Sequence, residues 1–75
     1  MEKTYVEVQA EFLKDGSMYP VSLLWKDKKI GIDKITNITP FDLTFRNQTG
    51  NRYTCISNGG EFLLYFDCRR WYVDF

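Results

Sequence analysis

The chain has 75 residues, with ten basic and ten acidic side chains and no histidine, so its net charge is zero. This balance argues against a generic polyanion-binding protein, which carries a strong basic excess. The lack of histidine excludes Ser-His and Cys-His nucleophile pairs, histidine general bases and most zinc sites. Aromatic residues make up 17% of the chain, which suits β-structure with a small dense core.

The first two predicted strands are 4–13 and 18–26, joined by a turn at Asp15-Gly16. Asp-Gly is typical of the two-residue type I′ turn, in which both central residues have positive φ. The pairs that this turn would place opposite one another are Phe12 and Tyr19, Ala10 and Val21, Val8 and Leu23, and Val6 and Trp25.

A tight turn at Asp27-Lys28 would lead into a third strand, 29–34, although lysine is a poor residue for positive φ. The pairs expected there are Trp25 with Ile30 and Leu23 with Ile32. Residues 35–40 break the apolar alternation. Because Pro40 has no N–H to donate to a ladder, this segment is interpreted as a crossover or bend between two halves.

The fourth and fifth predicted strands, 41–47 and 51–57, flank a three-residue loop, 48–50. Gly50 would take the left-handed position of that loop. The expected pairs are Phe45 with Tyr53 and Leu43 with Cys55.

The last strands, 60–67 and 70–75, follow from two short turns. Asn58-Gly59 is the strongest hairpin signal in the chain, and it pairs Cys55 with Phe62 and Tyr53 with Leu64. A two-residue turn after Asp67 places three pairs opposite one another: Phe66 and Trp71, Leu64 and Val73, and Phe62 and Phe75. The two registers, which are independent, agree on one apolar face. The core predicted from them consists of Trp25, Phe62, Leu64, Phe66, Trp71 and Val73.

Together these segments predict an all-β fold: a single antiparallel meander of about seven strands, forming one small β-domain over residues 1–75. No stretch shows the 3.6-residue apolar repeat of a helix, so no substantial helix is expected. A flat sheet would leave most of the large apolar side chains in water. The sheet is therefore expected to curl into a small barrel or half-barrel.

Compartment and redox state follow from what the chain lacks. Met1-Glu2-Lys3 leads into an alternating strand rather than an apolar run, so no signal peptide and no membrane partner are expected, and the predicted compartment is the cytoplasm. Cys55 and Cys68 lie roughly 20 Å apart in the predicted register, too far for a disulfide. We expect two free thiols, with Cys55 buried and Cys68 an incidental turn residue rather than a reactive one.

No catalytic constellation is recognisable. Glu7 and Glu11 share one strand face roughly 13 Å apart, too far for a glycosidase-type acid and base. Asn58-Gly59-Gly60 is a turn and not a phosphate loop, because no Lys-Ser or Lys-Thr helix start follows it. The prediction is a protein that is not an enzyme, with no cofactor and no metal.

One outward face combines aromatic, aliphatic and arginine side chains. The candidate binding residues on it are Arg52, Ile56, Leu63, Tyr65, Arg70 and Tyr72. Tyrosine and arginine are enriched at protein-binding hot spots, and such faces also stack nucleic-acid bases, or the tyrosines only stabilise the sheet. We expect a non-enzymatic binding module for a protein partner or a homodimer. Single-stranded nucleic acid is the alternative, and it is disfavoured because Asp67 and Asp74 partly neutralise the arginines.

Two motifs carry a resemblance to a known family. The first is Pro20, Leu23 and Trp25 in the order P-x-x-L-x-W. The second is the terminal hairpin, Leu64-Tyr65-Phe66-Asp67 followed by Arg70-Trp71-Tyr72-Val73. The chain thus resembles a small bacterial all-β family of unknown function over most of residues 18–75. The matching positions belong mostly to the expected core, so the resemblance implies a fold and no site.

Overall fold

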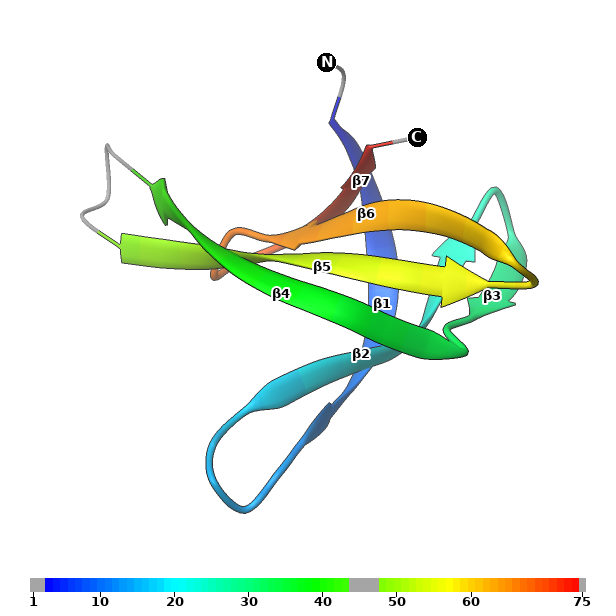
Figure 1. The fold of residues 1–75 in the computed structure, drawn as a ribbon. Coiled ribbons are helices and arrows are strands. Elements are labelled where there is room, and N and C mark those ends of the chain that lie inside the picture. The colour runs from blue at the N-terminus through cyan, green and yellow to red at the C-terminus, as the bar shows by residue number, and fades with distance from the viewer. Residues whose placement is uncertain (1–2, 44–47, 75) are drawn as a thin grey trace.

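The computed structural model describes residues 3–43 and 48–74. It contains seven β-strands, and no helix occurs in these two ranges (Figure 1). The strands are β1 (Thr4–Phe12), β2 (Met18–Trp25), β3 (Lys28–Gly31), β4 (Lys34–Leu43), β5 (Gln48–Ser57), β6 (Gly60–Phe66) and β7 (Trp71–Asp74). Every neighbouring pair is antiparallel. The all-β class and the seven antiparallel strands are therefore as predicted.

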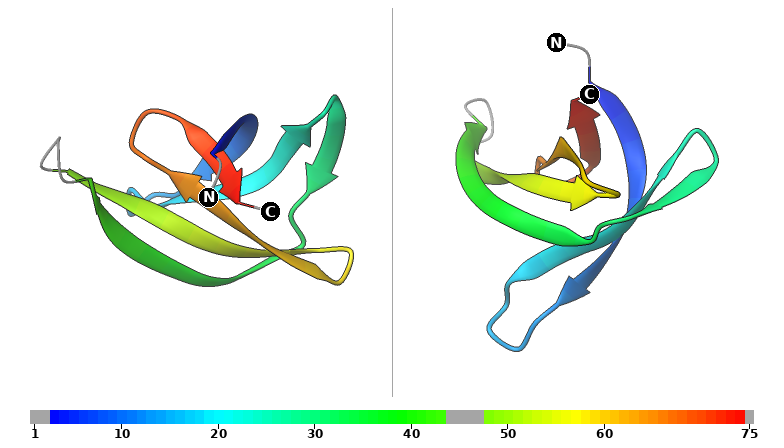
Figure 2. Two further views of the ribbon diagram at one scale, coloured as in Figure 1. Left: turned by 90° about the horizontal axis from the view of Figure 1, so that it is seen from above. Right: turned by 45° about the vertical axis from the view of Figure 1, so that its right-hand side comes forward.

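The strand order is β3-β2-β1-β7-β6-β5-β4, which is two meanders joined through β1 and β7. Both figures show the sheet curled on itself, with the far half of the β1–β2 hairpin projecting from the rest (Figures 1 and 2). The chain passes from one edge strand, β3, directly to the other, β4. At this corner the Asp33 amide donates to the Ile56 carbonyl at 2.8 Å, and the Ser57 hydroxyl donates to the Gly31 carbonyl at 2.6 Å. The sheet is a curled half-barrel and not a closed barrel.

The two C-terminal hairpins have the predicted registers. Asn58 and Gly59 take φ values of 50° and 76°, as a type I′ turn requires. The observed pairs include Cys55 with Phe62, Tyr53 with Leu64, Phe66 with Trp71, and Leu64 with Val73. The predicted pairing of Phe62 with Phe75 lies outside the described residues.

The predicted register is wrong at the tip of the β1–β2 hairpin. Phe12 faces Met18 instead of Tyr19, because the loop has three residues, 14–16, with Gly16 at φ 88°. The Leu13 amide donates to the Ser17 carbonyl at 2.9 Å. This is a type I turn followed by a left-handed glycine, the usual three-residue hairpin. A bulge after Gln9 absorbs the shift, so Val8 faces Leu23 as predicted.

The β2–β3 turn also differs from the prediction. It lies at Lys26-Asp27, whose φ values are 49° and 64°, and it pairs Leu23 with Ile30 rather than with Ile32. The slip is two residues, so each side chain keeps its predicted face. A type I′ turn needs two residues with positive φ. Lys26-Asp27 and Asp27-Lys28 each offer one lysine and Asp27, so residue type alone does not distinguish the two turns.

The segment 35–40, predicted as a crossover or bend, is instead part of a strand: β4 runs through Pro40, with a register shift between Ile35 and Asn37. Ser57 and Gly60 flank a two-residue turn and exchange hydrogen bonds, so the backbone groups of Ser57 point toward β6. Because backbone groups alternate in direction along β5, its hydrogen bonds to β4 reach Thr39 and Phe41. The nitrogen of Pro40 then faces outward from an edge strand, where proline is tolerated.

The β4–β5 register is accordingly wrong in the prediction. Tyr53 faces Ile38 and Cys55 faces Ile35, whereas Leu43 faces Gln48; Phe45 lies outside the described residues. Gly50 is not a turn residue. A Cβ at Gly50 would lie 2.5 Å from the Phe66 carbonyl oxygen and 2.8 Å from the Phe41 ring, so this glycine permits a close approach inside the sheet.

The core lies on the concave face of the curled sheet. Its fully buried members are Leu23, Tyr53, Cys55, Leu64 and Val73, and the predicted core residues Trp25, Phe62, Phe66 and Trp71 pack against them, partly buried. The ring of Trp71 lies 4.7 Å from that of Phe66 and 5.6 Å from that of Tyr53. The Tyr53 hydroxyl donates to the Met18 carbonyl at 3.0 Å, which ties β5 to β2.

Candidate binding surface

One row of side chains crosses five strands on the face opposite the core. In strand order from β1 to β4 the row consists of Tyr5, Tyr72, Tyr65, Arg52 and Thr39, each paired with the next. We call it the outer row. The registers of the C-terminal hairpins place Tyr65 beside Tyr72 and Arg52 beside Tyr65, as predicted, and the β1–β7 pairing adds Tyr5.

The rings of the outer row contact one another closely. Tyr65 and Tyr72 are stacked, with centroids 4.8 Å apart and planes 5° from parallel. The ring of Tyr5 meets that of Tyr72 edge-on at 5.8 Å, and the ring of Phe41 meets that of Tyr65 in the same way at 5.8 Å. Such aromatic pairs contribute about 0.5–1.5 kcal/mol each beyond area burial, so the row stabilises the sheet.

Three cations accompany the outer row. The Lys3 Nζ lies 5.1 Å from the Tyr72 ring centroid, and the Arg70 guanidinium lies 3.9 Å from that of Tyr5. Both arrangements are cation–π contacts. The Nε of Arg52 is buried without a hydrogen-bond partner, and an unsatisfied buried donor costs about 1–3 kcal/mol.

Exposure divides the six predicted binding residues. Arg70 is exposed, but Tyr72 retains only 4% of its surface. The remaining four, Arg52, Ile56, Leu63 and Tyr65, are partly buried. All six lie on the outer face, with Ile56 and Leu63 beyond the row. The stacked centre of the row is therefore largely internal, and its accessible part is the end that carries Tyr5 and Arg70.

That end forms a corner beside a cavity. Tyr5 is 43% exposed, and the turn after β6 holds Arg70 over its ring. The Asp67 carboxylate accepts hydrogen bonds from the Arg69 and Arg70 amides at 3.1 and 2.7 Å. The cavity, of about 590 Å³, is lined by Tyr5, Val6, Glu7, Val8, Arg69, Arg70 and Trp71. Its size suits a side chain or small ligand. We call this site the Tyr5–Arg70 corner.

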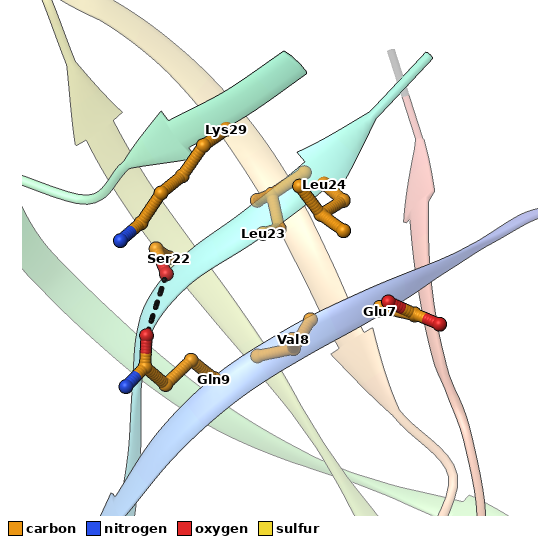
Figure 3. Close-up of a pocket in the computed structure, with 7 residues that line it drawn as sticks. All are labelled: Glu7, Val8, Gln9, Ser22, Leu23, Leu24 and Lys29. Atoms are coloured by element: carbon orange, nitrogen blue, oxygen red, sulfur yellow. Dashed lines mark hydrogen bonds between the residues drawn. The ribbon is translucent and has the colours of Figure 1, made fainter. Parts of the chain in front are cut away.

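A second cavity, of about 440 Å³, continues from the corner along β1 and shares Glu7 and Val8 with it. Figure 3 shows Lys29 extending toward Ser22, with Glu7 at the opposite end. Ser22 is 5% exposed and donates a hydrogen bond to the Gln9 amide oxygen at 3.4 Å. Leu24, which also lines this cavity, is 43% exposed.

A third cavity, of about 400 Å³, opens on the concave side under the β1–β2 hairpin. Phe12 and Ile38 line it and are 75% and 39% exposed. Cys68 stands at its rim, and its thiol donates to the Thr49 carbonyl at 3.1 Å. Both cysteines are free as predicted, Cys55 buried and Cys68 exposed. Burial raises the pKa of the Cys55 thiol to about 11.

The binding face predicted from the sequence did not include Tyr5, Lys3 or Phe41, and the exposure of Phe12 was not predicted. Alternation does put Lys3 and Tyr5 on the outward face of the first strand. However, no turn connects that strand to the last one, so its place beside Tyr72 had no local signal.

Within residues 3–43 and 48–74, no group of three or more acidic or cysteine side chains could hold a metal ion. In the same ranges no helix is long and apolar enough to cross a membrane. No family model matches the chain, no curated protein matches its sequence and no solved structure matches its fold.

Proposed function

We propose that this chain is a non-enzymatic protein-binding module that acts through the accessible end of its outer Tyr/Arg face. The observation that carries the proposal is the Tyr5–Arg70 corner. There a guanidinium lies on a tyrosine ring that is 43% exposed, and both side chains line a cavity of about 590 Å³. Tyrosine and arginine beside a pocket are the residues that most often dominate protein interfaces.

The geometry favours a protein partner over single-stranded nucleic acid. Base stacking needs a free ring face, but Tyr65 and Tyr72 stack on each other, and Tyr72 is 4% exposed. The chain is also neutral, so it lacks the basic excess that drives phosphate binding.

The test is selection of binding peptides from a random display library with the intact domain as bait. The selected peptides should bind at least about tenfold more weakly to Tyr5→Ser and Arg70→Ser, because hot-spot truncations cost more than 1 kcal/mol. Both side chains are exposed, so the fold should survive. Tyr72→Ser is unsuitable because it would remove a buried ring.

Glu61→Ser is the matched control, since Glu61 is exposed on β6 at the other end of the sheet. Peptides that bind the two corner variants as well as the wild type would contradict the proposal, and so would a selection without binders. Binding of single-stranded oligonucleotides that weakens steeply with salt would favour the alternative.

A further inference from the structure

β1 changes its pairing partner along its length. Thr4, Tyr5 and Val6 pair with β7, whereas the rest of the strand to Phe12 pairs with β2 alone. The hairpin that these residues form with β2 projects away from the larger meander (Figure 1). Within the sheet, therefore, the second half of β1 is a free edge.

The registers fix which backbone groups face this edge. Trp25 and Lys28 flank a two-residue turn and exchange hydrogen bonds. Alternation across β2 then directs the backbone of Glu7 toward β2 and that of Val8 away from it. From the other end, the Leu13 amide bonds to Ser17, which directs Ala10 and Phe12 away as well. We call Val8, Ala10 and Phe12 the open edge.

No backbone hydrogen bond outside the strand pairs involves the open edge among the described residues. The two outermost strands are protected against edge-to-edge pairing. β3 has four residues with Lys28 and Lys29, and β4 has an outward-facing Pro40 and a bulge after Ile35. The open edge has no proline, no lysine and no bulge on its own strand. An unprotected apolar edge of this kind is a template for another strand.

We propose that the open edge pairs with the open edge of a second copy of this chain, antiparallel and centred on Ala10. This inference rests on the proposed function because it names the protein partner. Val8 of each copy lies opposite Phe12 of the other, and the two Ala10 residues face each other on the twofold axis. The interface is self-complementary, as a twofold dimer requires. The net charge of zero places no overall repulsion between copies.

Charge selects this register. The outward side chains of the segment are Glu7, Gln9 and Glu11. Centred on Ala10, the pairing places Gln9 opposite Glu11 of the second copy and Glu7 opposite Leu13. Moving the second copy by two residues in one direction would put Glu7 opposite Glu11. Moving it by two residues in the other direction would put Glu11 opposite Glu11 of the second copy. Like charges directly opposite are destabilising, and only the Ala10-centred register uses all three open residues.

The same register places apolar side chains of one copy beside a cavity of the other copy. Phe12 and Leu13 are 75% and 46% exposed at the hairpin tip. In the dimer they lie beside Val8 and Glu7 of the second copy, which line the cavity of the Tyr5–Arg70 corner. By the twofold symmetry, the hairpin tip of each copy lies beside this cavity of the other copy.

Sedimentation equilibrium over a wide concentration range tests the proposal with a matched pair of variants. Gln9→Lys sets two lysines opposite Glu11 and should tighten the dimer roughly two- to thirtyfold, and Gln9→Glu should weaken it by a similar factor. Phe12→Ser should also weaken it. All these side chains are exposed, and the unfolding midpoint of dilute protein verifies that the fold is retained.

A monomeric wild type at every concentration would overturn the inference. So would a dimer that both Gln9 substitutions weaken, since that result would mean that Gln9 faces itself in a different register.

A covalent trap gives a second readout. Directly opposite residues of a hydrogen-bonded antiparallel pair have Cα atoms about 5.5 Å apart, which a disulfide can span. In a Cys68→Ser background, Ala10→Cys should form a disulfide-linked dimer under mild oxidation, whereas Leu24→Cys should not. Equal cross-linking of the two variants would contradict the Ala10-centred pairing.

The two proposals fail separately. If the chain is monomeric but corner-dependent peptides are selected, only the second-copy inference falls. If the dimer responds to Gln9 as expected but no peptide depends on Tyr5 or Arg70, the corner is not the general binding site, and the edge alone accounts for association.

Discussion

At the scale of single residues, Leu64 shows how closely two local turn signals define the core. It pairs with Tyr53 on one side and Val73 on the other and is 0% exposed. Leu64→Ala should lower the free energy of unfolding by about 2–5 kcal/mol, measured by urea denaturation. Leu24→Ala is the control, because Leu24 is 43% exposed, and its change should stay within about 0.5 kcal/mol. Equal effects of the two substitutions would mean that the β6 register is wrong.

Cys55 connects the core to pH. Burial raises the pKa of its thiol from the ordinary value of 9.0 to about 11. Above pH 9 the unfolded chain therefore loses a proton that the folded chain keeps. Stability from this group is full below pH 9 and declines up to about 11, by at most roughly 1.4 kcal/mol per pH unit.

The measurement is the difference in unfolding free energy between wild type and Cys55→Ala across this range, which cancels other alkaline titrations. As pH rises through this range, the unfolding free energy of the wild type should fall relative to that of the variant. A constant difference would contradict the raised thiol pKa. Under native conditions a thiol reagent should label the exposed Cys68 and reach Cys55 only on unfolding.

At the scale of elements, Gly50 explains why the observed β4–β5 register differs from the predicted one. Glycine near the middle of a polar segment indicates a turn, but here it lies within β5 because Phe41 and the Phe66 carbonyl leave no room for a Cβ. The same residue type serves either purpose, and only the packed neighbours distinguish them. Asn58-Gly59 and the turn after Asp67 were predictable because the turn residues themselves set the register.

Gly50→Ala should therefore destabilise the protein by about 1–3 kcal/mol, since a backbone carbonyl would have to move. Gly31→Ala is the matched control on another strand, where a Cβ would meet nothing within 4 Å. That substitution should be neutral or slightly stabilising, by about 0.4–1 kcal/mol. Thermal or urea unfolding of the two variants gives the comparison. Equal stability would contradict the close packing at Gly50.

At the scale of the whole molecule, the prediction covered the strands and missed how the two meanders meet. Both faces of most strands follow from alternation, which is why Arg52, Tyr65 and Tyr72 fall on one face as predicted. The pairing of Tyr5 with Tyr72 depends on the curvature of the whole sheet, and no short segment encodes it. That long-range pairing buries Tyr72 and moves the accessible part of the site to Tyr5 and Arg70.

The pairing of Thr4 with Val73 also has a kinetic consequence. It joins strands from nearly opposite ends of the chain, so the entropy of closing that loop is lost before the two meanders can support each other. A non-local pairing of this kind forms slowly, because the loop must close before its contacts are made. During synthesis, β1 would leave the ribosome long before β7 existed to cover its first residues. The nascent chain would then present β1 with its whole edge unpaired until the last strand was made.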